Sequence, residues 1–186
     1  MAVPRSIGAL EFSSIGIGYL AQDEMLKAAT VELLVARTIC SGKYLVIIGG
    51  SVSDVQSSIR SGMSKADEAV IDAMVLPNAH DSIFPALGQS VVLKPEEVGA
   101  LGIIETFSGT SVLAAADAAA KAANVKVFRI HVAMALGGKG LLLMTGGVAA
   151  VRAGVQAGAA QVRERGLLVS EIVIPRPSQE LFEEYI

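Results

Sequence analysis

The chain repeats its own pattern once, and this duplication limits the folds that it can adopt. Five landmarks recur in the same order, with offsets between 94 and 98 positions: Glu11 as Glu105, Lys27-Ala28-Ala29 as Lys121-Ala122-Ala123, Gly42-Lys43 as Gly138-Lys139, Val55 as Val151 and Pro77 as Pro175. Two copies are too few for a solenoid. The sequence therefore predicts two tandem domains, residues 1–93 and 94–186.

The order of secondary structure within one copy follows from hydrophobic periodicity and turn residues. In the first copy the predicted elements are a strand at Ile7–Glu11, a helix at Tyr19–Ala29, strands at Val31–Ile39 and Tyr44–Ile48, a helix from Val52 to Met63 and a strand at Ala69–Leu76. This β-α-β-β-α-β order is the split βαβ, or ferredoxin-like, arrangement. We expect an α/β fold of the α+β kind, with antiparallel strand pairs.

The composition favours close packing and excludes several function classes. Hydrophobic residues make up 52% of the chain and aromatic residues 4%, so the interior must be packed from small side chains. The formal net charge of −3, without a basic stripe, argues against a nucleic-acid partner. The uncharged run 140–151 is too short to cross a membrane. Residues 1–5 lack the long apolar core of a secretion signal, and we expect a cytosolic protein.

Two other motifs suggest enzyme chemistry only weakly. Gly16-Ile17-Gly18 stands between a strand and a helix, as in a dinucleotide-binding turn. The second copy has Thr110 and Val112 at the glycine positions, so small residues at a tight turn are the favoured interpretation. His80 and His131 lie far apart in the sequence, and nothing around them sets up a recognisable acid–base motif. A nucleotide-binding enzyme therefore remains only a distant alternative.

The only cysteine, Cys40, lies in the stretch Thr38–Lys43, at a Ser-Gly turn between two predicted strands. One thiol cannot hold a zinc ion or an iron–sulfur cluster, which need several ligands. A cyclic trimer would bring three copies of this loop together at its axis. The aligned loop of the second copy, from Met134 to Gly138, contains no cysteine. Three thiols among six loops would then surround the axis.

The chain resembles the bacterial microcompartment (BMC) shell proteins, specifically the tandem-domain class that forms trimers. The resemblance rests on the repeated opening strands, the repeated Lys-Ala-Ala and the closing Val173-Ile174-Pro175-Arg176-Pro177. Within the class, Thr38–Lys43 and the Pro-Arg-Pro end are most similar to the PduT-type iron–sulfur trimers of propanediol-utilisation compartments.

The resemblance implies a structural protein, not an enzyme, that forms a flat pseudohexameric homotrimer. Such a trimer tiles edge to edge with other shell proteins in the microcompartment shell, inside the cytoplasm. Lys27 and Lys121 match the family's edge lysines, and Arg176 matches its edge arginine, which Asn78 replaces in the first copy. No nucleic acid or membrane is expected as a partner.

The resemblance also implies the central site. It assigns the pore to the loops that contain Ser41, Gly42, Gly137 and Gly138. It further implies that Cys40 from three subunits binds one 4Fe–4S cluster, which would transfer electrons or be exchanged across the shell, with encapsulated redox enzymes as possible partners. The alternative is a trimer whose pore passes a small metabolite without a metal centre.

Overall fold

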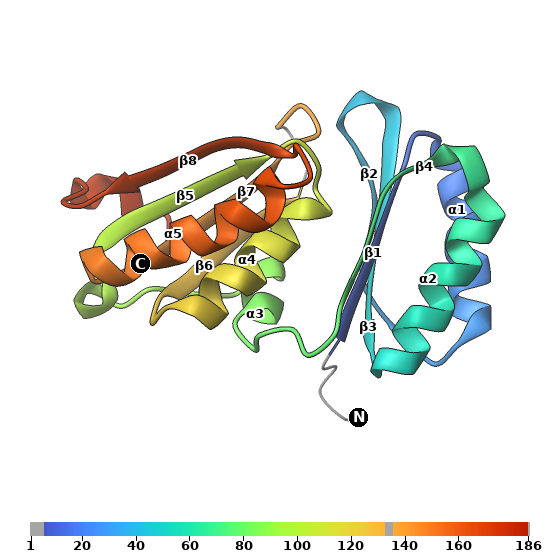
Figure 1. The fold of residues 1–186 in the computed structure, drawn as a ribbon, viewed down its shortest axis with the longest axis horizontal. Coiled ribbons are helices and arrows are strands. Elements are labelled where there is room, and N and C mark those ends of the chain that lie inside the picture. Colours follow the sequence, from blue (N-terminus) through green and yellow to red (C-terminus); the bar gives the residue numbers. More distant parts are fainter. Residues whose placement is uncertain (1–5, 133–135, 186) are drawn as a thin grey trace. The chain divides into compact units, whose positions relative to one another are not determined.

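The computed structural model describes residues 6–132 and 136–185. These residues form two compact units, one of residues 6–79 with 136–138 and the other of residues 80–132 with 139–185. Each unit contains a four-stranded antiparallel sheet with two long helices on one face (Figure 1). The predicted β-α-β-β-α-β order is confirmed in both copies. The boundary between residues 93 and 94 stays a prediction.

The first unit has the strand order β2-β3-β1-β4. Its elements are β1 (Ser6–Phe12), α1 (Ile15–Ala28), β2 (Glu32–Ile39), β3 (Lys43–Gly50), α2 (Val52–Ala66) and β4 (Val70–Leu76). Short 3-10 turns, η1 (Cys40–Gly42) and η2 (Asp67–Ala69), precede β3 and β4. Because β2 and β3 form a hairpin, the turn η1 lies at the end of the sheet.

The second unit repeats this arrangement with the strand order β6-β7-β5-β8. Its main elements are β5 (Ala100–Thr106), α4 (Ser111–Ala122), β6 (Lys126–Val132), β7 (Gly140–Gly146), α5 (Val148–Arg163) and β8 (Leu168–Ile174). It also contains the short helix α3 (Ile83–Leu87) and the 3-10 turns η3 (Pro95–Glu97) and η4 (Gln179–Phe182). The three strand pairs of this sheet are all antiparallel, as in the first unit.

Helix α1 begins at Ile15, and the predicted start at Tyr19 was wrong. The Ser14 side chain caps the helix by accepting a hydrogen bond from the backbone N–H of Ile17 at 3.4 Å. Gly16 and Gly18 therefore lie in the first turns of the helix and not in a loop before it. The two glycines suggested a turn, but a capped helix tolerates them.

The core of the first unit lies between its sheet and its two helices. Alternate residues of β1 and β3 point into it, and α1 and α2 close it, so that Leu10, Phe12, Val46, Ile48, Met25 and Val55 are completely buried. The Ser58 hydroxyl in α2 donates a hydrogen bond to the backbone oxygen of Met25 in α1 at 2.8 Å. This bond joins the two helices near Gly62, where a Cβ atom would lie 2.6 Å from the Met25 side chain.

Gly18 explains the glycine motif by packing. A Cβ atom at Gly18 would lie 2.6 Å from the ring of Tyr44, which is buried at the start of β3. In the second copy, Val112 is at the position of Gly18 and Gly140 is at the position of Tyr44. A Cβ at Gly140 would lie 2.6 Å from the Cβ of Val112. A small helix residue faces a large strand residue in one copy, and the sizes are exchanged in the other.

Gly18→Ala should lower the free energy of unfolding by about 1–3 kcal/mol, the usual cost of overpacking a core. Gly16→Ala is the matched control, because its Cβ would meet no atom within 4 Å. Alanine is the better helix former, so this control should be neutral or stabilise the protein by up to about 1 kcal/mol. Chemical denaturation of both variants checks the prediction, and equal effects would contradict the packing explanation.

The C-terminal segment covers one face of the second sheet. Phe182 is completely buried beside Phe128 of β6, with ring centroids 5.9 Å apart, and Tyr185 meets the same ring edge-on at 5.0 Å. The Tyr185 carbonyl accepts a hydrogen bond from the backbone N–H of Leu93 at 2.6 Å. The guanidinium of Arg129 stacks 4.8 Å from the centroid of the Tyr185 ring. These contacts fix both the segment before β5 and the chain end on this face.

Burial, together with a hydrogen bond to Glu184, raises the pKa of Tyr185 to about 12. The unfolded tyrosine ionises near pH 10, so the unfolded state loses this proton first as pH rises. The folded state therefore keeps the full stabilisation from protonated Tyr185 below about pH 10. This contribution is lost between about pH 10 and 12. Unfolding midpoints measured across this range should fall less steeply for Tyr185→Phe than for the unaltered protein. Equal pH dependence of the unfolding midpoint in the two proteins would show that ionisation of Tyr185 does not affect stability.

Candidate functional site

Cys40 lies at the tip of the β2–β3 hairpin. Ile39 and Lys43 are the last paired residues, so the turn η1 holds only Cys40, Ser41 and Gly42. The Cys40 residue is half-buried, whereas Ser41 and Gly42 are exposed. Both residues after the cysteine adopt left-handed backbone conformations, with φ of 66° and 71°. The turn thus places Cys40 at the end of the hairpin.

The aligned loop of the second copy belongs to the same compact unit as the Cys40 turn. Its described part, residues 136–138, clusters with residues 6–79. Gly137 and Gly138 also have left-handed backbones, with φ of 64° and 86°. Met134 lies outside the described residues. The structure therefore brings the two predicted pore loops into one unit, and their role as a pore stays a prediction.

A buried ion pair supports the base of the Cys40 turn. Lys43 Nζ lies 2.9 Å from a carboxylate oxygen of Glu11, whose side chain is completely buried. In the second copy Lys139 Nζ lies 3.7 Å from Glu105, which also accepts a hydrogen bond from the Ser170 hydroxyl at 2.8 Å. Sequence reasoning used Gly42-Lys43 and Gly138-Lys139 only as alignment landmarks. The recurrence of both lysine and glutamate was the signal that could have identified the pairs.

The two predicted edge lysines occur at the same place in their helices but in different surroundings. Lys27 is in the last turn of α1 and pairs with Asp23, and both side chains are mostly exposed. This hydrogen bond raises the pKa of Lys27 above its usual value. Lys121, in the last turn of α4, pairs at 2.6 Å with Asp117, which is largely buried and also accepts the backbone N–H of His80 at 2.8 Å. Lys121 is thus held more firmly than Lys27.

The remaining predicted edge residues, Arg176 and Asn78, are both exposed. Asn78 has a left-handed backbone, with φ of 53°, directly after Pro77 and β4. Arg176 is not among the described residues with positive φ. The two copies therefore differ here in backbone conformation as well as in side chain.

Within residues 6–132 and 136–185, no three histidine, cysteine, aspartate or glutamate side chains gather closely enough to hold a metal ion. The His80 ring contacts the Ser82 hydroxyl at 2.9 Å through Nδ1. One chain alone therefore offers a single thiol ligand at Cys40.

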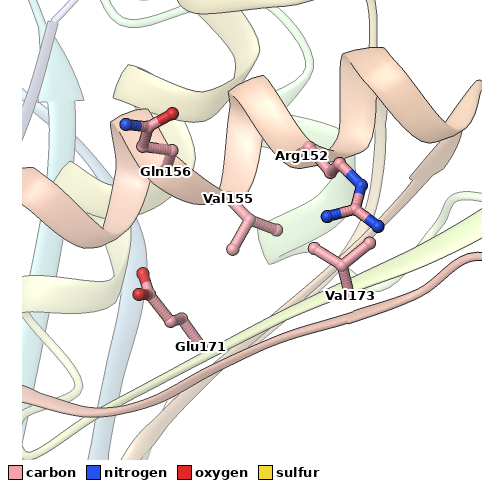
Figure 2. Close-up of a pocket in the computed structure, with 5 residues that line it drawn as sticks. All are labelled: Arg152, Val155, Gln156, Glu171 and Val173. Atoms are coloured by element: carbon pink, nitrogen blue, oxygen red, sulfur yellow. The ribbon is translucent and has the colours of Figure 1, made fainter.

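A groove of about 390 Å³ runs between α5 and the edge strand β8 (Figure 2). Val155 and Val173 contribute apolar surface, and Arg152, Gln156 and Glu171 contribute polar groups. The Glu171 carboxylate accepts a hydrogen bond from Arg163 at 2.7 Å. None of the five lining side chains is a nucleophile or a histidine, so the groove does not assemble an acid–base constellation.

The dinucleotide-binding interpretation of Gly16-Ile17-Gly18 is wrong. A Rossmann turn joins a strand of a parallel sheet to a helix, whereas β1 pairs antiparallel with both of its neighbours. The glycines lie within α1, where Gly18 makes room for the Tyr44 ring.

Comparison with known proteins agrees with this architecture. Residues 6–79 and 100–177 each match the BMC domain family. Over 183 residues the chain is 43% identical to the bacterial microcompartment shell protein PduT of Citrobacter freundii, with 98% of each chain covered. It is also 43% identical over 86 residues to the shell protein EutM of Salmonella typhimurium, covering 46% of this chain and 88% of that protein.

A solved structure has the same fold. The crystal structure of a microcompartment protein from Desulfitobacterium hafniense superposes with a TM-score of 0.88 and is 45% identical, covering 96% of this chain and 98% of the other. The described helices include none that is long and apolar enough to cross a membrane. The relatives are shell proteins and not enzymes. The chain therefore belongs to the BMC domain family and is a tandem-domain shell protein of a bacterial microcompartment.

Proposed function

We propose that this chain forms a flat, pseudohexameric homotrimer in the shell, with Cys40 of three subunits binding one 4Fe–4S cluster at the central axis. The observation that carries the proposal is the position of the only cysteine, on a three-residue turn at the tip of a hairpin. The similarity to PduT over 98% of both chains supports a PduT-like role. Other shell proteins are then its neighbours at the tile edges.

The donor set fits such a cluster only when subunits combine. Iron–sulfur clusters are held by thiolates, and each chain supplies one. A three-fold axis supplies three thiolates and leaves one iron for a ligand that is not a protein thiolate. The half-buried Cys40 and the exposed Ser41 and Gly42 leave the turn open on one side, since a Cβ at Gly42 would meet no atom within 4 Å. The turn thus has room for a shared group.

In this arrangement the sheets and helices of each chain hold the Cys40 turn at the axis. The backbone of Ser41 and Gly42 sets the direction of the thiol. A bound cluster would supply one-electron transfer, which suits exchange of electrons across the shell with encapsulated redox enzymes; exchange of the cluster itself is the other role of this site. Lys27, Lys121 and Arg176 would contact neighbouring tiles.

Cys40→Ala should leave the trimer intact and abolish iron binding, because it removes every cysteine from the chain. The protein is purified and reconstituted without oxygen, and visible absorption and electron paramagnetic resonance are recorded beside Cys40→Ser and the unaltered protein. The unaltered trimer should carry a cluster that Cys40→Ala lacks. A colourless, iron-free trimer from the unaltered sequence would contradict the proposal and favour a metabolite pore.

Lys27→Ala combined with Lys121→Ala should weaken sheet formation while trimers persist. An exposed ion pair contributes about 0.2–1 kcal/mol, so losing both edge contacts should raise the concentration needed for sheets by roughly twofold to thirtyfold. Lys65→Ala is the matched control, since it removes an exposed lysine that pairs with Glu24 at 3.6 Å. Light scattering and electron microscopy give the readout. Sheets that form as readily as with the control would show that the two lysines are ordinary surface charges.

A further inference from the structure

The two copies differ in charge at the end of the sheet that carries the Cys40 hairpin. The strand register places four residues in one row of each sheet: Arg37, Leu45, Glu11 and Asp72 in the first, and His131, Leu141, Glu105 and Ser170 in the second. The first row therefore has an arginine and an aspartate where the second has a histidine and a serine. The row with more charged side chains belongs to the copy that contains the cysteine.

Lys43 joins this row directly to the Cys40 turn. It is the first residue of β3 and pairs with Ile39, so it closes the three-residue turn. Its ammonium lies 2.9 Å from Glu11, with the lysine side chain 24% and the glutamate side chain 0% exposed. A completely buried carboxylate is very unfavourable without a cation. Glu11 therefore restrains the Lys43 ammonium strongly.

The same ammonium lies beside the second predicted pore loop. A Cβ atom at Gly138 would be 3.7 Å from Lys43 Nζ, within the unit to which both residues belong. Gly138 is buried and has a left-handed backbone. The positive charge is thus fixed between its own loop and the loop of the second copy.

The equivalent lysine of the second copy is held less firmly. Lys139 lies 3.7 Å from Glu105, and the two side chains are 42% and 35% exposed. The Ser170 hydroxyl also donates a hydrogen bond to the Glu105 carboxylate. Water screens this pair more effectively than the buried pair of the first copy.

We infer that Glu11 is a positioning residue that fixes the Lys43 ammonium beside the Cys40 turn, where this charge favours the reduced state of the cluster. The inference rests on the proposed function. Reduction adds one electron, delivered by a one-electron donor such as a reduced flavin or an iron–sulfur protein, and breaks no bond. A fixed positive charge in poorly solvated surroundings stabilises the added negative charge.

The first test measures the reduction potential of the reconstituted trimer by redox titration monitored with electron paramagnetic resonance. Glu11→Gln keeps the side-chain shape and removes the negative charge, and this single variant is the reference for the double variant. Adding Lys43→Met to Glu11→Gln removes the positive charge as well, so the double variant should have a more negative potential than the single variant. In the matched control, adding Lys139→Met to Glu105→Gln should lower the potential less. Identical potentials for the single and double variants would overturn an action of Lys43 on the cluster.

The second test needs no cluster. Lysine labelling of the intact trimer with an amine-reactive reagent, followed by mass spectrometry, reports how firmly each ammonium is held. Glu11→Gln should raise the labelling rate of Lys43 several-fold, and Glu105→Gln should change that of Lys139 less. Unchanged labelling of Lys43 would overturn the positioning role. A trimer that binds no iron but shows the expected labelling would overturn the cluster and the tuning while supporting the positioning role of Glu11.

Discussion

Both copies depend on helices that lie closer to the sheet, and to each other, than ordinary side chains permit. A Cβ at Gly8 would be 2.7 Å from Val55, and one at the equivalent Gly102 would be 2.8 Å from Val151. At Gly158 of α5 a Cβ would lie 2.6 Å from the backbone oxygen of Ala115 in α4. Dense packing of this kind resists small displacements. The strand ends, from which the hairpin turns start, are therefore held in fixed positions.

This packing also explains how a duplicated chain can develop two different halves. The exchange of sizes between Gly18 with Tyr44 and Val112 with Gly140 keeps the volume of the core while changing the residues. The loop at the hairpin tip is less constrained by the core. A cysteine, or a longer glycine turn, can stand there without disturbing the sheet, and the two copies differ in sequence at this place.

The sequence was sufficient to predict the duplication, the order of the elements and the turn at Cys40, because each depends on local patterns: recurring landmarks, hydrophobic periods and Ser-Gly turn residues. The start of α1 was predicted too late, because a cap by Ser14 outweighed two glycines. The size exchange at Gly18 could not be predicted, since it depends on a residue of a distant strand. The Lys43–Glu11 pair joins positions 32 residues apart and was missed, although the recurrence of both residues in the second copy could have indicated it.

On the proposed arrangement, one thiol per chain becomes one shared metal site per trimer. Native mass spectrometry of the trimer, purified and kept without oxygen, can count iron and sulfide on the intact assembly. We expect a trimer whose mass exceeds that of three chains by a single 4Fe–4S cluster, and no such addition with Cys40→Ala. Iron bound to single chains, several clusters on one trimer or an unliganded mass under these conditions would contradict it.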